Sequence, residues 1–115
     1  MSLPLAVRSR FGARLLAPVF GHVGNGNFHC LVLADPRTPE AVTAAGAFSH
    51  RLVHRALRHG GTSTGEYGAG LHKMQYLVDE HGAHTVALMR ATKQALDPHN
   101  IFSPGKVASF NEAVC

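Results

Sequence analysis

The chain has 115 residues, 45% of them hydrophobic, which allows one globular domain and argues against a disordered segment. Its formal net charge is +4, but the basic residues form no dense run and show neither a zinc-finger spacing nor the basic and aromatic interleaving of RNA-binding sheets. No apolar stretch approaches the roughly 20 residues of a membrane helix. We therefore expect neither nucleic-acid binding nor a transmembrane segment.

The first twenty residues contain three arginines, two serines and no acidic residue, a composition typical of mitochondrial transit peptides. However, Leu15 to Phe20 run directly into a motif without a processing spacer. We therefore interpret residues 1–14 as an N-terminal extension or the start of a truncated chain. The two cysteines, Cys30 and Cys115, are too few and too distant in sequence for a disulfide framework, which favours a reducing compartment.

Two strands are predicted first, at Leu15–Phe20 and Asn27–Leu33, with a glycine-containing connection between them. In the second strand, apolar residues alternate onto both faces, so we expect both faces to be at least partly covered. Two strands alone do not make a stable sheet, which indicates that part of a larger structure is missing.

A long helix should follow, because Thr38 is a suitable N-cap, Pro39 fits the first helical position and Gly60-Gly61 end the apolar periodicity. A glycine-rich loop at 61–70 leads to two shorter predicted helices, at about Leu71–His81 and Ala83–Leu96. The last helix is apolar on most of its circumference, which predicts burial on more than one side. Asp97-Pro98 should end it, and an irregular segment follows. The predicted class is α+β, with a short antiparallel sheet and about three helices.

His22 and His29 are the first candidates for chemistry, because they flank a glycine-rich turn that can fold back and bring both imidazoles together. Imidazole binds zinc, manganese and iron, and Glu66 in the second glycine-rich loop could complete a three-ligand site. The alternative is that each histidine is an ordinary core or surface residue. His50 and His54 lie four residues apart on the predicted helix, but no glutamate follows His50, so the zincin pattern is absent.

Neither glycine-rich segment supports nucleotide binding by itself. The first lacks the third glycine and the following helix of a dinucleotide fingerprint. The second lacks the Gly-Lys-Ser/Thr of a phosphate-binding loop.

Three blocks of the sequence, in order, resemble one known family. They are LLAPVFGHVGNGNFHCLVLADP, GGTSTGEYGAGLHKMQYL and LMRATKQALDPHNIFSPGKV. They are similar to blocks of the flavin-linked oxidases related to vanillyl-alcohol oxidase, especially the D-lactate dehydrogenases. The resemblance implies that residues 15–110 are a partial FAD-linked oxidase C-terminal cap domain, with a tail at 111–115.

By this resemblance, His22, His29 and Glu66 are ligands of a divalent metal, zinc or manganese, that binds a 2-hydroxy acid. The α-hydrogen would leave as hydride to FAD, with Asn27 and the segment around Lys106 near the flavin. The resemblance also implies a partner, an FAD-binding domain or subunit absent from this chain. The expected location is the bacterial cytoplasm or the eukaryotic mitochondrion, without secretion.

Residue 67 departs from the family pattern, since Tyr67 stands where the family has a histidine suited to be the base. Tyrosine ordinarily titrates near pH 10 and histidine near about 6.5, so a tyrosine is a poor base at neutral pH. Asn25 replaces an aspartate, and Ser103 replaces an asparagine. We expect the isolated chain to be inactive although its family is one of FAD-dependent oxidoreductases. The alternatives are a non-catalytic fragment that at most binds a metal and, less favoured because no general base is evident, a metal hydrolase.

Overall fold

A computed structural model of the chain describes residues 6–8 and 14–107. It divides into two compact units, Met1–Arg55 and Ala56–Cys115, which are described separately below. The predicted N-terminal extension over 1–14 lies mostly outside the described residues, and the predicted tail over 111–115 lies wholly outside them.

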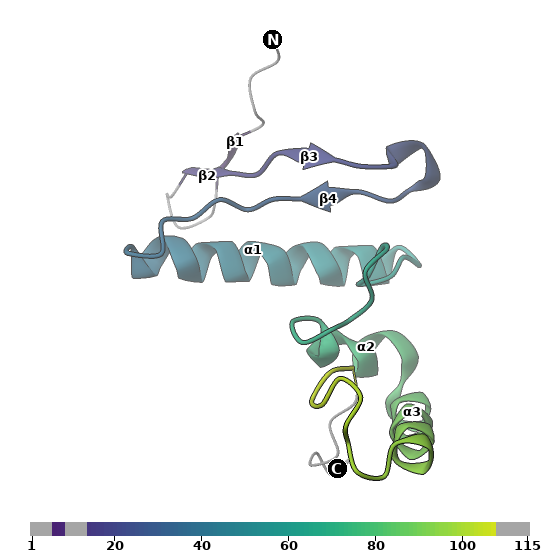
Figure 1. Cartoon of the computed structure of the whole chain (residues 1–115). Helices are drawn as coiled ribbons and strands as arrows, with labels where there is room; N and C mark the ends of the chain where they lie inside the picture. The colour runs from purple at the N-terminus through teal and green to yellow at the C-terminus, as the bar shows by residue number, and fades with distance from the viewer. Residues whose placement is uncertain (1–5, 9–13, 108–115) are drawn as a thin grey trace. The chain divides into compact units, whose positions relative to one another are not determined.

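Short antiparallel strands form the first part of the first unit (Figure 1). Strand β1 (Ala6–Arg8) pairs with β2 (Arg14–Leu16), and β3 (Val19–Phe20) pairs with β4 (His29–Cys30). The β3–β4 hairpin extends beyond its two strands toward β2. The amide of Leu31 donates to the carbonyl of Pro18, and the amide of Leu33 donates to the carbonyl of Leu16. The expected antiparallel hairpin is therefore present.

The two predicted strands are nevertheless shorter and more interrupted than expected. The predicted strand Leu15–Phe20 breaks at Pro18, since proline has no N–H to return the hydrogen bond that its carbonyl accepts from Leu31. The predicted strand Asn27–Leu33 is reduced to β4 and a single bridge at Leu33.

Gly21 fixes the path of the chain into the tip of the hairpin. Its φ of 129° is one that residues with a Cβ rarely adopt. A Cβ at this position would also lie 3.1 Å from the Cα of Phe28 and 3.2 Å from the carbonyl oxygen of Asn27. The tip itself is one 3₁₀ turn, η1 (Val23–Asn25), which ends at Gly26 in the left-handed conformation.

Helix α1 (Pro39–Arg58) begins directly after Thr38, as predicted. The carbonyl of Thr38 accepts hydrogen bonds from the amides of Ala41 and Val42. At the other end, the amides of Gly60 and Gly61 donate to the carbonyls of Leu57 and Ala56, the pattern of a Schellman cap. The buried residues of the first unit come from the strands and from this helix, and they are Leu15, Ala17, Ala44 and Val53.

The second unit contains η2 (Met74–Tyr76), α2 (Leu77–His81) and α3 (Ala83–Leu96). The bounds of α3 are those predicted. The other predicted helix, Leu71–His81, begins too early: regular α-helix starts only at Leu77, after the 3₁₀ turn. Gly70 has a positive φ, and Lys73 is held in a turn by the bond from its ammonium group to the carbonyl of Ser63. Tyr76, Leu77 and Val86 form the small apolar core.

The two predictions of burial have different outcomes. The strand Asn27–Leu33 is partly covered, as expected, because His29, Cys30 and Val32 are half-buried while Leu31 and Leu33 are 51% and 56% exposed. The prediction for α3 is wrong, because Leu88 and Leu96 are 67% and 78% exposed. Among the described residues of α3, only Val86 is buried. The fold class is as predicted, α+β with three helices and short antiparallel sheets. Within the described ranges, no helix is long and apolar enough to cross a membrane.

Candidate functional site

His22 and His29 lie at the same end of the hairpin in the first unit. Phe20 pairs with His29 across the strands, and their ring centroids are 5.2 Å apart. His22 follows Phe20 by two residues, and its carbonyl accepts hydrogen bonds from the amides of Asn25 and Asn27. His29 is half-buried and His22 is exposed. The glycine-rich turn thus returns the chain so that both predicted imidazole ligands belong to one local structure.

The predicted carboxylate ligand, Glu66, belongs to the second unit and is exposed. Glu66 and the two histidines therefore belong to different units of the chain. Over residues 6–8 and 14–107, no three histidine, cysteine, aspartate or glutamate side chains form a cluster able to hold a metal ion. The ligand set His22, His29 and Glu66 stays a prediction.

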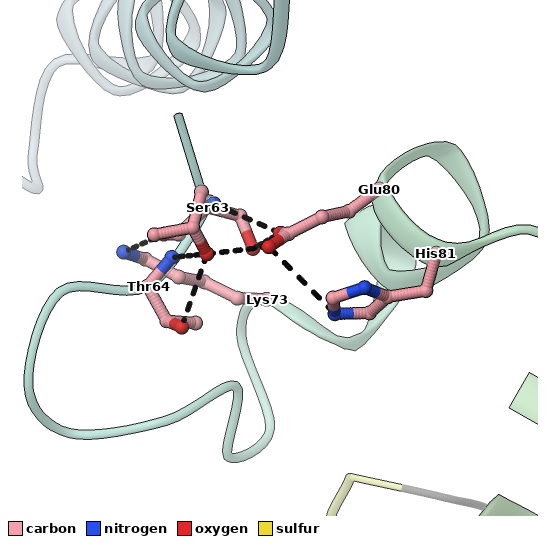
Figure 2. Close-up of polar contacts among 6 residues, drawn as sticks. Ser63, Thr64, Lys73, Glu80 and His81 are labelled. Atoms are coloured by element: carbon pink, nitrogen blue, oxygen red, sulfur yellow. Dashed lines mark hydrogen bonds and ion pairs between the residues drawn. The ribbon is translucent and has the colours of Figure 1, made fainter. Parts of the chain in front are cut away.

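The loop that carries Glu66 is anchored at its start by Glu80 of α2 (Figure 2). The carboxylate of Glu80 accepts hydrogen bonds from the hydroxyl of Thr62 (2.5 Å) and from the amide (2.9 Å) and hydroxyl (2.7 Å) of Ser63. The ammonium group of Lys73 donates to the carbonyl of Ser63 (2.5 Å). Ser63 is buried, so these bonds satisfy its polar groups away from water and fix where the loop begins.

Glu80 is ionised in this setting. Its partial burial would raise the pKa of the carboxyl group, but the bonds from Thr62 and Ser63 and the nearby imidazole of His81 outweigh burial. The imidazole Nε2 of His81 lies 3.7 Å from the Glu80 carboxylate. The net result is a pKa below the ordinary value of 4.5.

Asp97 anchors the segment after α3 in the same way. Its carboxylate accepts hydrogen bonds from the amides of Ile101 and Phe102, each 2.9 Å long, and pairs with the ammonium group of Lys93. Lys93 also donates to the carbonyl of Phe102. Burial would raise the pKa of Asp97, but these donors outweigh burial and lower it. The turn after α3 is thereby fixed by one buried carboxylate.

The second unit also contains an open groove of about 800 Å³. The groove is lined by residues of the glycine-rich loop, of α3 and of the segment 102–107, namely Tyr67, Gly68, Ala69, Gly70, Thr85, Leu88, Met89, Thr92, Lys93, Phe102, Ser103, Lys106 and Val107. The amide of Val107 donates to the carbonyl of Gly70 (3.0 Å) and joins this segment to the loop.

The groove brings together Tyr67 and Lys106, two of the predicted site residues, along with Ser103. Tyr67 is 85% exposed, so its phenol is open to solvent. An apolar wall on α3, exposed loop backbone and the ammonium group of Lys106 suit a flat ligand that carries negative charge. Asn27, the other predicted flavin contact, is half-buried in the hairpin of the first unit, where its amide donates to the carbonyl of His22.

Sequence reasoning missed the residues that position the site, Glu80, Lys73, Lys93 and Asp97. The contact between Ser63 and Glu80 spans seventeen residues, and no local pattern marks it. Asp97 gave a local signal as an aspartate before proline, but that signal indicated a helix end, not a carboxylate that binds later backbone amides.

Comparison with known proteins identifies the family. The profile of FAD linked oxidases, C-terminal domain, matches residues 6–107. The "Probable D-lactate dehydrogenase, mitochondrial" of Danio rerio is 43% identical over 98 residues, which cover 85% of this chain and 20% of that protein. The "D-lactate dehydrogenase [cytochrome], mitochondrial" of Arabidopsis thaliana is 43% identical over 93 residues, covering 81% of this chain and 16% of that protein.

A "D-2-hydroxyglutarate dehydrogenase" of Xanthomonas citri is 38% identical over 96 residues, covering 82% of this chain and 20% of that protein. The chain thus spans a fifth or less of the length of these curated relatives. Because the profile matches residues 6–107, most of the chain, the chain belongs to the family of FAD linked oxidases, C-terminal domain.

Proposed function

We propose that this chain supplies the substrate- and metal-binding part of an FAD-dependent dehydrogenase of D-2-hydroxy acids, of which D-lactate is the first candidate. The observation that carries the proposal is the groove in which the loop after Glu66 and the segment at Lys106 meet. Two relatives named as D-lactate dehydrogenases, each 43% identical, support the substrate class. The relative named as a D-2-hydroxyglutarate dehydrogenase keeps a larger hydroxy acid open.

The donor set His22, His29 and Glu66 fits zinc or manganese by its chemistry, since two imidazoles and one carboxylate leave positions open for a substrate. The hairpin supports this set by holding both histidines at one end. A divalent ion on these residues would bind the carboxylate and hydroxyl of the substrate and acidify that hydroxyl.

The apolar wall of the groove and the ammonium group of Lys106, which lines it, suit part of a flavin. A bound flavin would accept the hydride that leaves the α-carbon. Lys106 would orient the ligand and attract its negative charge, and Asn27 stays a second proposed flavin contact on the resemblance alone. We further propose that an FAD-binding domain or subunit provides the remaining contacts, and that the protein acts in mitochondria or in a bacterial cytoplasm.

The second candidate is a non-catalytic metal-binding protein, and Tyr67 favours it. The phenol is 85% exposed at the rim of the groove, where the resemblance leads us to expect a histidine base. Unless another group removes the hydroxyl proton, a chain with tyrosine at this position would bind the substrate and leave it unreacted.

A chimera tests both candidates. The matched segment of the Danio rerio relative is replaced by residues 6–107 of this chain, and reduction of a dye by D-lactate is measured with FAD and Zn²⁺ or Mn²⁺ present. We expect measurable turnover that falls about 100-fold or more in His22→Ala, because a metal ligand is lost. Tyr67→His should raise turnover by about tenfold or more if residue 67 limits proton removal.

Two outcomes would decide against the dehydrogenase. A folded chimera that binds FAD and metal but reduces no dye with any 2-hydroxy acid, even as Tyr67→His, favours the non-catalytic protein. Turnover that is unchanged in His22→Ala refutes the proposed ligand set while leaving the flavin reaction intact. Glu40→Gln, at an exposed position on α1, serves as the matched control.

A further inference from the structure

His50, which is exposed, and His54, which is half-buried, form a close pair on α1, outside the site described above. They lie one helical turn apart, and residues spaced in this way share one side of a helix. Their Nε2 atoms are 3.2 Å apart, whereas their ring centroids are 4.2 Å apart and the ring planes are inclined by 41°. The two Nε2 atoms, which can ligate metals, therefore lie closer together than the ring centres do.

The distance between the two nitrogens fits a shared ion. Zinc–nitrogen bonds are about 2.0–2.1 Å long, so a right angle at the metal separates two ligand nitrogens by about 2.8–3.0 Å. A tetrahedral angle separates them by about 3.3–3.4 Å with the same bond lengths. The observed 3.2 Å lies between these values. An ion can join the two imidazoles with small side-chain rotations and no movement of the helix backbone.

The same distance is compatible with a hydrogen bond from one imidazole N–H to the other ring, since a neutral imidazole has one donor and one acceptor. A metal would displace that shared proton, because ligating nitrogens must be deprotonated. The hydrogen-bonded pair and the metal-bound pair use the same two nitrogen atoms. A metal titration distinguishes them.

Space for further ligands lies beside His50. A hollow of about 390 Å³ is lined by Gly46, Ala47, His50 and Arg51. Side chains on a helix lean toward its N-terminus, and the residues three and four positions before His50 are small. Water molecules or a small anion have room there, and Arg51 would attract an anion.

We propose that His50 and His54 form a second metal site, a two-imidazole site for a divalent transition metal such as Zn²⁺ or Cu²⁺. With only two protein ligands, the ion keeps open positions and exchanges readily, unlike the ion of a closed four-ligand structural site. Cu²⁺ should bind more tightly than Zn²⁺, following the general order of affinity of nitrogen ligands for these ions.

The test is titration of the full chain with Zn²⁺ by calorimetry, and with Cu²⁺ by electron paramagnetic resonance, which counts coordinated nitrogens. All variants carry His22→Gln, so that the hairpin does not supply its proposed ligand. We expect two coupled nitrogens, and a fall in Zn²⁺ affinity of about tenfold or more in either His50→Gln or His54→Gln, because one of two ligands is lost. His59→Gln, at an exposed position past the helix end, should leave the affinity unchanged.

A variant with the same number of histidines makes the test sharper. In the double variant His54→Gln, Arg55→His, the second imidazole moves to the fifth position after His50, off the shared side of the helix. We expect its affinity to match that of His54→Gln, with helix content by circular dichroism equal to that of the parent. The proposal is overturned if this double variant binds as tightly as the parent, or if the parent binds no more metal than the variant lacking both His50 and His54.

Discussion

Glu80→Ala tests whether one carboxylate holds the glycine-rich loop of the second unit. The substitution removes the acceptor of three hydrogen bonds, from the hydroxyl of Thr62 and from the amide and hydroxyl of Ser63. Thr62 is exposed and can turn to water. Ser63 is only 4% exposed, so its amide and hydroxyl would lose their partner within the protein.

The expected loss follows from these contacts. A buried polar group left without a partner costs about 1–3 kcal/mol, and Ser63 has two such groups, so after partial rehydration we expect Glu80→Ala to lower the free energy of unfolding by about 2–4 kcal/mol. Glu80→Gln keeps one carbonyl oxygen as an acceptor and should cost about half as much. Urea denaturation followed by circular dichroism measures both. Glu40→Gln, on the exposed first turn of α1, is the control and should cost about 1 kcal/mol or less.

The pH dependence gives an independent check. Because the pKa of Glu80 is lowered on folding, its contribution to stability is complete above the ordinary value of 4.5 and disappears as the pH falls through the lower value of the folded state. The difference in unfolding free energy between the parent and Glu80→Gln should therefore shrink below about pH 4. A Glu80→Ala variant within about 0.5 kcal/mol of the parent at pH 7 would refute the anchoring argument.

Three further changes test other parts of the structure. Gly21→Ala should lower the free energy of unfolding by about 2–3 kcal/mol in urea denaturation, since its φ of 129° and the 3.1 Å approach to Phe28 both disfavour a Cβ; a loss below about 0.5 kcal/mol would contradict this. Asp97→Ala should increase amide hydrogen exchange at Ile101 and Phe102, whose amides lose their acceptor, and unchanged protection there would contradict the role of Asp97. Lys106→Met in the chimera should weaken FAD binding by about tenfold in a fluorescence titration, and equal affinity would remove Lys106 from the flavin site.

Local signals in the sequence predicted the regular elements well. Pro39 at the start of α1 and the paired glycines at its end mark boundaries by their own backbone restrictions, and α3 begins and ends where predicted. Errors arose where a distant contact decides the conformation. Lys73, inside the predicted helix, lies in a turn, and its ammonium group donates to the Ser63 carbonyl, ten residues earlier in the chain. Helix propensity describes the preference of each residue in its local sequence and takes no account of a partner ten residues away.

The candidate site divides along the same line. Tyr67 and Lys106 were selected by resemblance and do line one groove. The carboxylates that hold the start of the glycine-rich loop and the segment after α3, Glu80 and Asp97, resemble ordinary helix and turn residues in the sequence. Their role becomes visible only in the structure, which shows the backbone amides that donate hydrogen bonds to the two carboxylates. Residues that would contact a ligand are thus easier to find from a motif. Residues that position those ligand contacts are harder to find in this way.

Apolar side chains of α3 stay exposed although the sequence predicts their burial. Periodicity placed apolar residues around most of α3 and on both faces of the predicted strand Asn27–Leu33. It was wrong about the burial of α3, because Leu88 and Leu96 stay more than half exposed in the part of the chain that the structure describes. Hydrophobic pattern reports the environment for which a residue is suited and not what covers it. At about 25 cal/mol for each Å² of apolar surface removed from water, covering even part of these faces is worth several kcal/mol. A partner domain, as proposed for the flavin, would therefore stabilise this chain as well as complete its groove, and flavin affinity and chain stability should rise together when that partner is added.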